Sequence, residues 1–164
     1  MSEGLGSLKG MTIRVEHHGN EDVIHGDPDT LLHVTNRVRL LGDAIHGVHI
    51  HPGGTLTTSG IINNWLQVDT GGACYTSGLI HAQPLVAEGG LLDIRGWLTI
   101  PRLRREQPGT ILLAIGAQYN DTVLLPDGTL TPSTGTGEAR QSAPRYRITS
   151  GGREPILIPA IDVG

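Results

Sequence analysis

Glycine recurs at a fixed interval of 18 residues through the middle of this chain. Three Gly-Gly pairs, at 53–54, 71–72 and 89–90, are separated by that interval, and a column of single glycines keeps the same spacing: Gly42, Gly60, Gly78 and Gly96. Self-similarity of this kind is typical of repeat proteins, in which each structural unit packs only against its neighbours. The chain is therefore predicted to fold as a stack of equal coils.

A finer period of six residues lies inside the longer one. Every sixth residue from 32 to 98 is apolar, twelve in succession: Leu32, Val38, Ala44, Ile50, Leu56, Ile62, Val68, Cys74, Ile80, Val86, Leu92 and Leu98. This period fits neither an α-helix nor the simple alternation of a strand. It indicates one short strand and one corner, three to a coil. We therefore predict an all-β fold, a short triangular β-solenoid of about four 18-residue coils, stacked ~4.8 Å apart.

The glycines predict where the coils bend. A glycine two residues before an inward residue marks two corners in each coil, and the third corner is predicted to carry Val48, Leu66 and Pro84. The block 31–48 keeps the same frame with Thr35-Asn36 in place of Gly-Gly. Cys74 falls in the inward column, so we interpret it as a small buried hydrophobe and not as a nucleophile.

The two ends of a coil stack are unpaired strand edges that must be covered or used. Residues 1–30 are the predicted N-terminal cap and residues 103–164 a β-rich C-terminal cap, which together with the solenoid at 31–102 form one domain. Within the C-terminal part, residues 110–117 read as a buried strand after a break in the period at Arg104. Two hairpins are predicted beyond it, one turning at Asp127-Gly128 and one at Gly151-Gly152.

Composition narrows the class of protein. A net charge of −4 and only five aromatic residues among 164 argue against a nucleic-acid partner. No apolar stretch approaches the ~18 residues of a membrane span. One cysteine cannot form an internal disulfide, and no apolar leader segment opens the chain, so we expect a cytoplasmic protein.

Histidines gather at the start of the solenoid. The segment HGVHIH contains His46, His49 and His51, and in the 18-residue frame His33 shares an outward column with His51, followed by Asp69. Clustered imidazoles are zinc ligands, so these four histidines are the candidate metal site. The alternative is a set of solvated surface side chains, in which case no cofactor is needed.

A second outward column supplies a candidate surface for a protein partner, formed by Arg39, Thr57, Tyr75 and Asp93. No nucleotide-binding or nucleophile motif accompanies it. We therefore expect a non-enzymatic protein that acts in self-assembly or in specific protein binding through its faces. Two alternatives remain: an inhibitor or immunity-type binder of another protein, and a zinc-dependent enzyme that uses the cluster of His33, His46 and His51.

The blocks LQVDTGGACYTSGLIHA and PLVAEGGLLDIRGWL resemble bactofilins over about residues 48–100. That resemblance implies a triangular right-handed β-helix that polymerises end to end and requires neither nucleotide nor metal.

The six-residue period is also similar to that of the hexapeptide-repeat proteins, which include acyltransferases and γ-class carbonic anhydrases. In this second resemblance, His46 and His51 look like paired zinc ligands.

Overall fold

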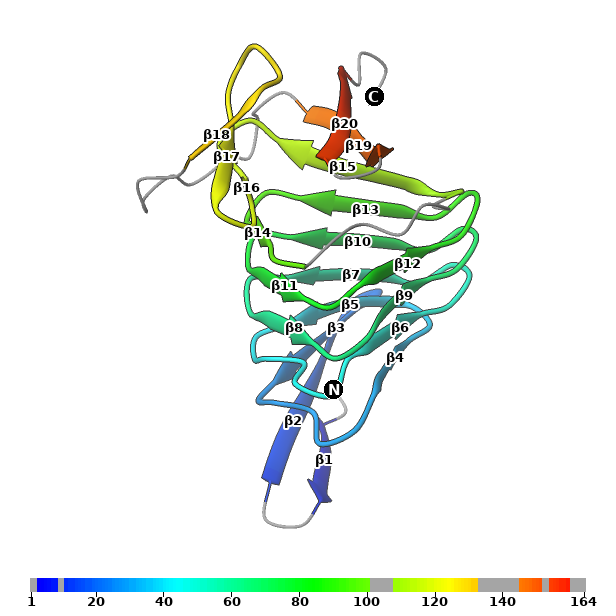
Figure 1. The fold of residues 1–164 in the computed structure, drawn as a ribbon. Helices are drawn as coiled ribbons and strands as arrows, with labels where there is room; N and C mark the ends of the chain where they lie inside the picture. Colours follow the sequence, from blue (N-terminus) through cyan, green and yellow to red (C-terminus); the bar gives the residue numbers. More distant parts are fainter. Residues whose placement is uncertain (1–2, 9–10, 101–107, 133–144, 152–153, 160–164) are drawn as a thin grey trace.

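The computed structural model describes residues 3–8, 11–100, 108–132, 145–151 and 154–159. These residues form twenty β-strands and no helix, and the strands stack as a β-solenoid of about five turns (Figure 1). The all-β solenoid predicted from the period is confirmed, with about one turn more than the period indicated. Since the described residues contain no helix, none of them forms a helix that could cross a membrane.

Three parallel sheets make the three faces of the solenoid (Figure 1). Face A contains β5 (Arg37–Leu40), β7 (Thr55–Thr58), β10 (Ala73–Thr76), β13 (Leu91–Ile94) and β15 (Thr110–Ala114). Face B contains β4 (Leu32–Val34), β6 (Val48–Ile50), β9 (Leu66–Val68) and β12 (Pro84–Val86). Face C contains β8 (Ile61–Asn63), β11 (Leu79–His81), β14 (Trp97–Leu98) and β16 (Gln118–Tyr119). Each full coil runs through face B, then A, then C.

The six-residue column forms the core of the stack. Eleven of its twelve residues are buried, and Leu32 is half-buried. Because side chains alternate along a strand, a second set of inward residues lies two positions away on faces A and B. These additional buried residues are Leu40, Thr58, Thr76 and Ile94 on face A and Val34, Val48, Leu66 and Pro84 on face B. Stacked side chains from the three faces, mostly aliphatic, thus fill the triangular interior.

The third corner lies elsewhere than predicted. Val48, Leu66 and Pro84 are the first residues of the face B strands, and their side chains are buried inside the stack. The chain turns just before them instead, where Gly47 and Asn64 adopt positive φ angles of 97° and 71°. The apolar column predicted one inward residue on each strand, whereas each strand of face B has two. The second one occupies the position that was predicted as the corner.

The first coil is out of register with the 18-residue frame. Leu32 pairs with Val48 and His33 with His49, an offset of 16 residues, because the corner at 35–36 is two residues long and the corner at 51–54 is four. A slip of two residues leaves the same side chains facing inward. It pairs His33 with His49 instead of His51 across the sheet, while the side chain of His33 still contacts that of His51.

Antiparallel strands extend face A at both ends. At one end β3 (Glu21–His25) pairs in parallel with β5 and is followed outward by β2 (Met11–His18) and β1 (Glu3–Leu8). At the other end β19 (Arg145–Gly151) pairs with β15 and β20 (Glu154–Pro159) with β19. Sheet formation is therefore continuous from one hairpin, through the solenoid, to the other (Figure 1).

Much of the predicted C-terminal part is present. The apolar run at 110–117 contains the buried strand β15, and β17 (Thr122–Leu124) forms a hairpin with β18 (Leu130–Pro132) around the predicted turn, where Gly128 has a φ of +86°. The second predicted hairpin is the pair β19–β20, whose turn residues 152–153 lie outside the described residues. The predicted break at Arg104 also lies outside them.

Candidate functional site

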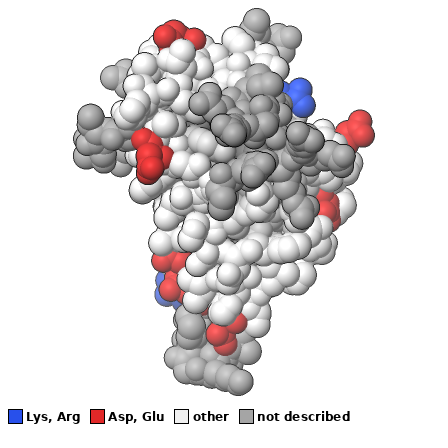
Figure 2. Space-filling model, in the orientation of Figure 1, with Lys and Arg blue, Asp and Glu red and all other residues white. Residues whose placement is uncertain are grey.

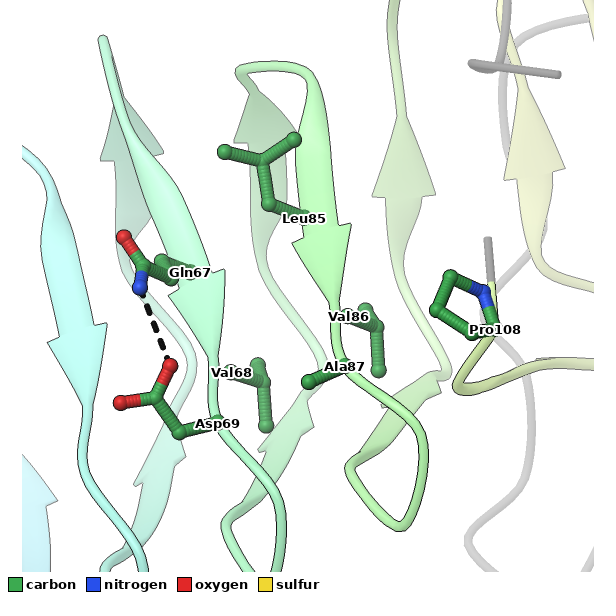
Figure 3. Close-up of a pocket in the computed structure, with 7 residues that line it drawn as sticks. All are labelled: Gln67, Val68, Asp69, Leu85, Val86, Ala87 and Pro108. Carbon is green, nitrogen blue, oxygen red and sulfur yellow. Dashed lines mark hydrogen bonds between the residues drawn. The ribbon is translucent and has the colours of Figure 1, made fainter. Parts of the chain in front are cut away.

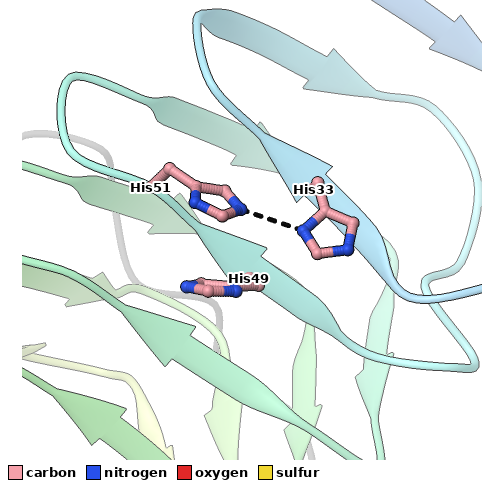
Figure 4. Close-up of side chains that lie close together, drawn as sticks. All are labelled: His33, His49 and His51. Atoms are coloured by element: carbon pink, nitrogen blue, oxygen red, sulfur yellow. Dashed lines mark hydrogen bonds between the residues drawn. The ribbon is translucent and has the colours of Figure 1, made fainter.

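Three imidazole rings meet on the outer surface of face B. His33 lies on β4 opposite His49 of β6, and His51 follows directly after β6. The Nδ1 of His33 lies 2.9 Å from the Nε2 of His51, within hydrogen-bonding distance (Figure 4). The rings of His49 and His51 are stacked, with centroids 3.9 Å apart and an interplanar angle of 27°. His33, His49 and His51 therefore form one contiguous group, called the histidine cluster below.

A carboxylate orients one member of the histidine cluster. The Nε2 of His49 lies 2.8 Å from Oδ2 of Asp69, and the other carboxylate oxygen of Asp69 accepts a hydrogen bond of 3.0 Å from the side-chain amide of Gln67. The hydrogen bond from Gln67, followed by that with His49, lowers the pKa of Asp69 below its ordinary value. Asp69 is therefore held as an anion beside the imidazoles, with both carboxylate oxygens engaged.

The predicted set of four histidines is divided in the structure. His46 is exposed on the corner before β6 and is not part of the group that brings three possible ligand atoms together. The hexapeptide resemblance favoured His46 and His51 as paired zinc ligands. In the structure His51 belongs to the histidine cluster and His46 does not. The sequence also did not single out Gln67, although it lies 18 residues beyond His49 and pairs with it on face B.

A pocket of about 290 Å³ opens on the same face, next to the cluster (Figure 3). Its walls include Gln67 and Asp69 of the hydrogen-bonded chain that leads to His49. The rest of its lining is apolar, from Val68, Leu85, Val86, Ala87 and Pro108. Asp69 therefore contacts the histidine cluster on one side and borders the pocket on the other.

The predicted partner-binding column is only partly at the surface. Arg39 and Thr57 are exposed and Tyr75 is half-buried, all in consecutive strands of face A. Asp93, the fourth member, is only 4% exposed. It lies beneath Arg145, whose Nε is 3.3 Å from both carboxylate oxygens, and beside Arg95 at 3.4 Å. Asp93 thus joins β19 to the solenoid and is not accessible to a partner.

Face C carries an apolar stripe that the sequence did not reveal. Ile61, Leu79 and Trp97 are paired neighbours on β8, β11 and β14. Ile61 and Trp97 are each 39% exposed, and Leu79 is half-buried. Most charged side chains in Figure 2 lie toward the margins of the view, which shows faces B and C. The three side chains of the stripe are thus apolar, and Asp43 borders it at one end by accepting a hydrogen bond from the backbone N–H of Ile61.

Comparisons with family models, with curated proteins and with solved structures found no match to this chain. The class of protein is defined by the fold alone: a β-solenoid built from a β-helix repeat, with antiparallel strands added at both ends.

Proposed function

We propose that this protein binds a partner protein through the apolar stripe of face C, formed by Ile61, Leu79 and Trp97. The observation that carries this proposal is the exposure of two large apolar side chains, Ile61 and Trp97, with Leu79 of the intervening coil between them. Contiguous apolar side chains on the surface of a protein are typical of sites that bind another protein. Aromatic residues such as Trp97 contribute strongly to the affinity of protein interfaces. The hydrogen-bonded sheet holds the three side chains in fixed positions, so little ordering is needed on binding.

The ends of the molecule favour binding through a face over polymerisation through the ends. A bactofilin-like filament would pair the terminal coils of successive molecules. Here hairpins occupy both ends of face A, and the outermost strand β20 contains Pro155 and Pro159, which have no N–H to donate to a further strand. The proposed role is therefore that of a discrete binding module, with a second copy of the chain or another protein as the partner.

A charge placed in the stripe tests the proposal. Trp97→Arg should abolish binding, because the introduced charge would lose its water in the interface. Trp65→Arg is the control and should leave binding unchanged. Trp65 is about as exposed as Trp97 but lies outside the stripe, on the corner before face B. Light scattering after size exclusion measures self-association of the three proteins. Quantitative mass spectrometry of proteins captured from the native host measures binding to other proteins.

The two variants have distinct outcomes. Loss of self-association or of a captured protein with Trp97→Arg alone supports the stripe as the interface. Equal behaviour of both variants and the wild-type protein in both measurements would contradict it.

A further inference from the structure

The histidine cluster has nearly the dimensions of a metal site. One ring nitrogen from each of His33, His49 and His51 lies within 4.8 Å of the other two. In tetrahedral coordination with Zn–N bonds of 2.0–2.1 Å, ligand nitrogens lie about 3.3 Å apart. The existing separation of 2.9 Å between His33 and His51 is shorter than that value by a few tenths of an ångström. A small spreading of this pair would thus admit an ion.

The ring arrangement shows which side chains must move. Two imidazoles bound to one tetrahedral ion have centroids roughly 5 Å apart by the same geometry. His33 already lies at 5.1 Å from His51 and at 5.7 Å from His49, whereas His49 and His51 are only 3.9 Å apart. Binding therefore requires the stacked pair to separate by side-chain rotation at the surface. The paired strands β4 and β6 remain in place.

Asp69 supplies the partner that zinc-binding histidines characteristically have. Metal-ligating imidazoles usually donate their second N–H to a carboxylate, which fixes the tautomer and raises the basicity of the ligand. Donation from Nε2 of His49 to Asp69 leaves Nδ1 of His49 with its lone pair free for an ion. Gln67 in turn holds Asp69 in place. The hydrogen bond to Asp69 thus orients His49 as a ligand, and His33 and His51 lie next to it.

The donor set selects the class of ion. Three neutral imidazoles suit zinc and neighbouring transition metals and not Mg²⁺ or Ca²⁺, which prefer oxygen ligands. Three protein ligands also leave a fourth position for water or another ligand. We propose that His33, His49 and His51 bind one divalent transition metal ion of the zinc class, with Asp69 as the positioning residue for His49. This site lies on face B, apart from the apolar stripe of face C.

Calorimetric titration of the full-length, tag-free chain with Zn²⁺ tests the stoichiometry and the ligands. The wild-type protein should bind one ion per chain. His33→Gln and His51→Gln should weaken binding at least tenfold, whereas His46→Gln should bind as the wild type does, because His46 is a nearby exposed histidine outside the cluster. Asp69→Asn should weaken binding about 10- to 100-fold through its effect on His49.

A spectroscopic readout requires no variant. Substoichiometric Co²⁺, a paramagnetic probe, should broaden the imidazole proton signals of His33, His49 and His51 and spare those of His46 and His81. Absence of saturable Zn²⁺ binding, or unchanged binding after simultaneous replacement of the three cluster histidines by glutamine, would overturn the proposal. So would equal broadening of the signals of these five histidines, among the eight in the chain. These results are independent of those for the face C interface, since no residue is shared.

Discussion

At the scale of single residues, the glycine repeat serves two separate physical purposes. Gly53, Gly71 and Gly89 have φ angles between +81° and +84°, which glycine adopts without strain. Gly60, Gly78 and Gly96 are present for a different reason: a Cβ on each would lie 2.0–2.2 Å from the carbonyl oxygen of the preceding glycine in the same column. The sequence located both columns, but only the structure distinguishes a conformational need from a steric one.

This distinction predicts unequal costs for the same substitution. Gly78→Ala should lower the free energy of unfolding by about 3 kcal/mol or more, since its Cβ meets backbone that must shift along with the adjoining coil. Gly53→Ala should cost only about 1–2 kcal/mol, because no atom lies within 4 Å of its Cβ and only the positive φ opposes the change. Urea denaturation of both variants measures the difference, and equal losses would contradict the steric explanation.

Cys74 behaves as its place in the apolar column predicted. It is fully buried between coils, and burial, aided by the negative charge of Asp93, raises the pKa of its thiol to about 12. Almost no thiolate is therefore present near neutral pH, and the sulfur has no path to solvent. We expect the folded protein to resist alkylation by iodoacetamide at pH 8 for hours and to react completely in denaturant. Mass spectrometry measures the labelling, and rapid labelling of the native chain would show that the thiol of Cys74 is accessible.

At the scale of elements, the strand β19 is held to the solenoid by an ion pair that the repeat pattern could not predict. Asp93 and Arg145 have side chains only 5% and 13% exposed, so removal of the carboxylate leaves buried guanidinium groups without that partner. Asp93→Ala should cost about 3–5 kcal/mol in unfolding free energy. Thr57→Ala, at an exposed position of the same column, should cost little.

Hydrogen exchange locates the effect of this change. Amides of β19 that pair with β15 should exchange faster in Asp93→Ala than in Thr57→Ala, because the anchor of the hairpin is lost. If the two variants had equal stability and equal exchange, Asp93 would not be the anchor.

The elements also show how far sequence periodicity reaches. The inward column at every sixth residue follows from the apolar period, because the narrow core admits small and aliphatic side chains there. The second set of inward residues was not predicted. The offset of β4 cannot be predicted from that period, because a slip of two residues keeps the same alternation and leaves the apolar pattern almost unchanged. Of the four histidines in the candidate metal site, the structure brings His33, His49 and His51 together and leaves His46 outside the group. The burial of Asp93 depends on Arg145, 52 residues away and outside the repeat.

At the scale of the whole molecule, the solenoid is longer than its glycine repeat. The Gly-Gly signal ends at Gly89-Gly90, yet β15 and β16 continue the parallel pairing of faces A and C. Within the described residues, no further coil stacks on β15 and β16 in these faces, because β19 pairs with β15 and β17 with β16 in antiparallel fashion. The repeat sequence is therefore not required there. The end of a sequence repeat is thus a poor guide to the end of the stack.

The antiparallel ends predict the size of the particle in solution. Because β2 covers the edge of β3 that would otherwise be open, the full-length chain should form discrete particles and not filaments. Deletion of residues 1–18 removes β1 and β2 and leaves the edge of β3 unpaired, so the shortened chain should associate further in a concentration-dependent manner. Size exclusion with light scattering and negative-stain microscopy measure both proteins. Filaments formed by the full-length chain, or a shortened chain that associates no more than the full-length one, would show that these strands do not act as a barrier to edge pairing.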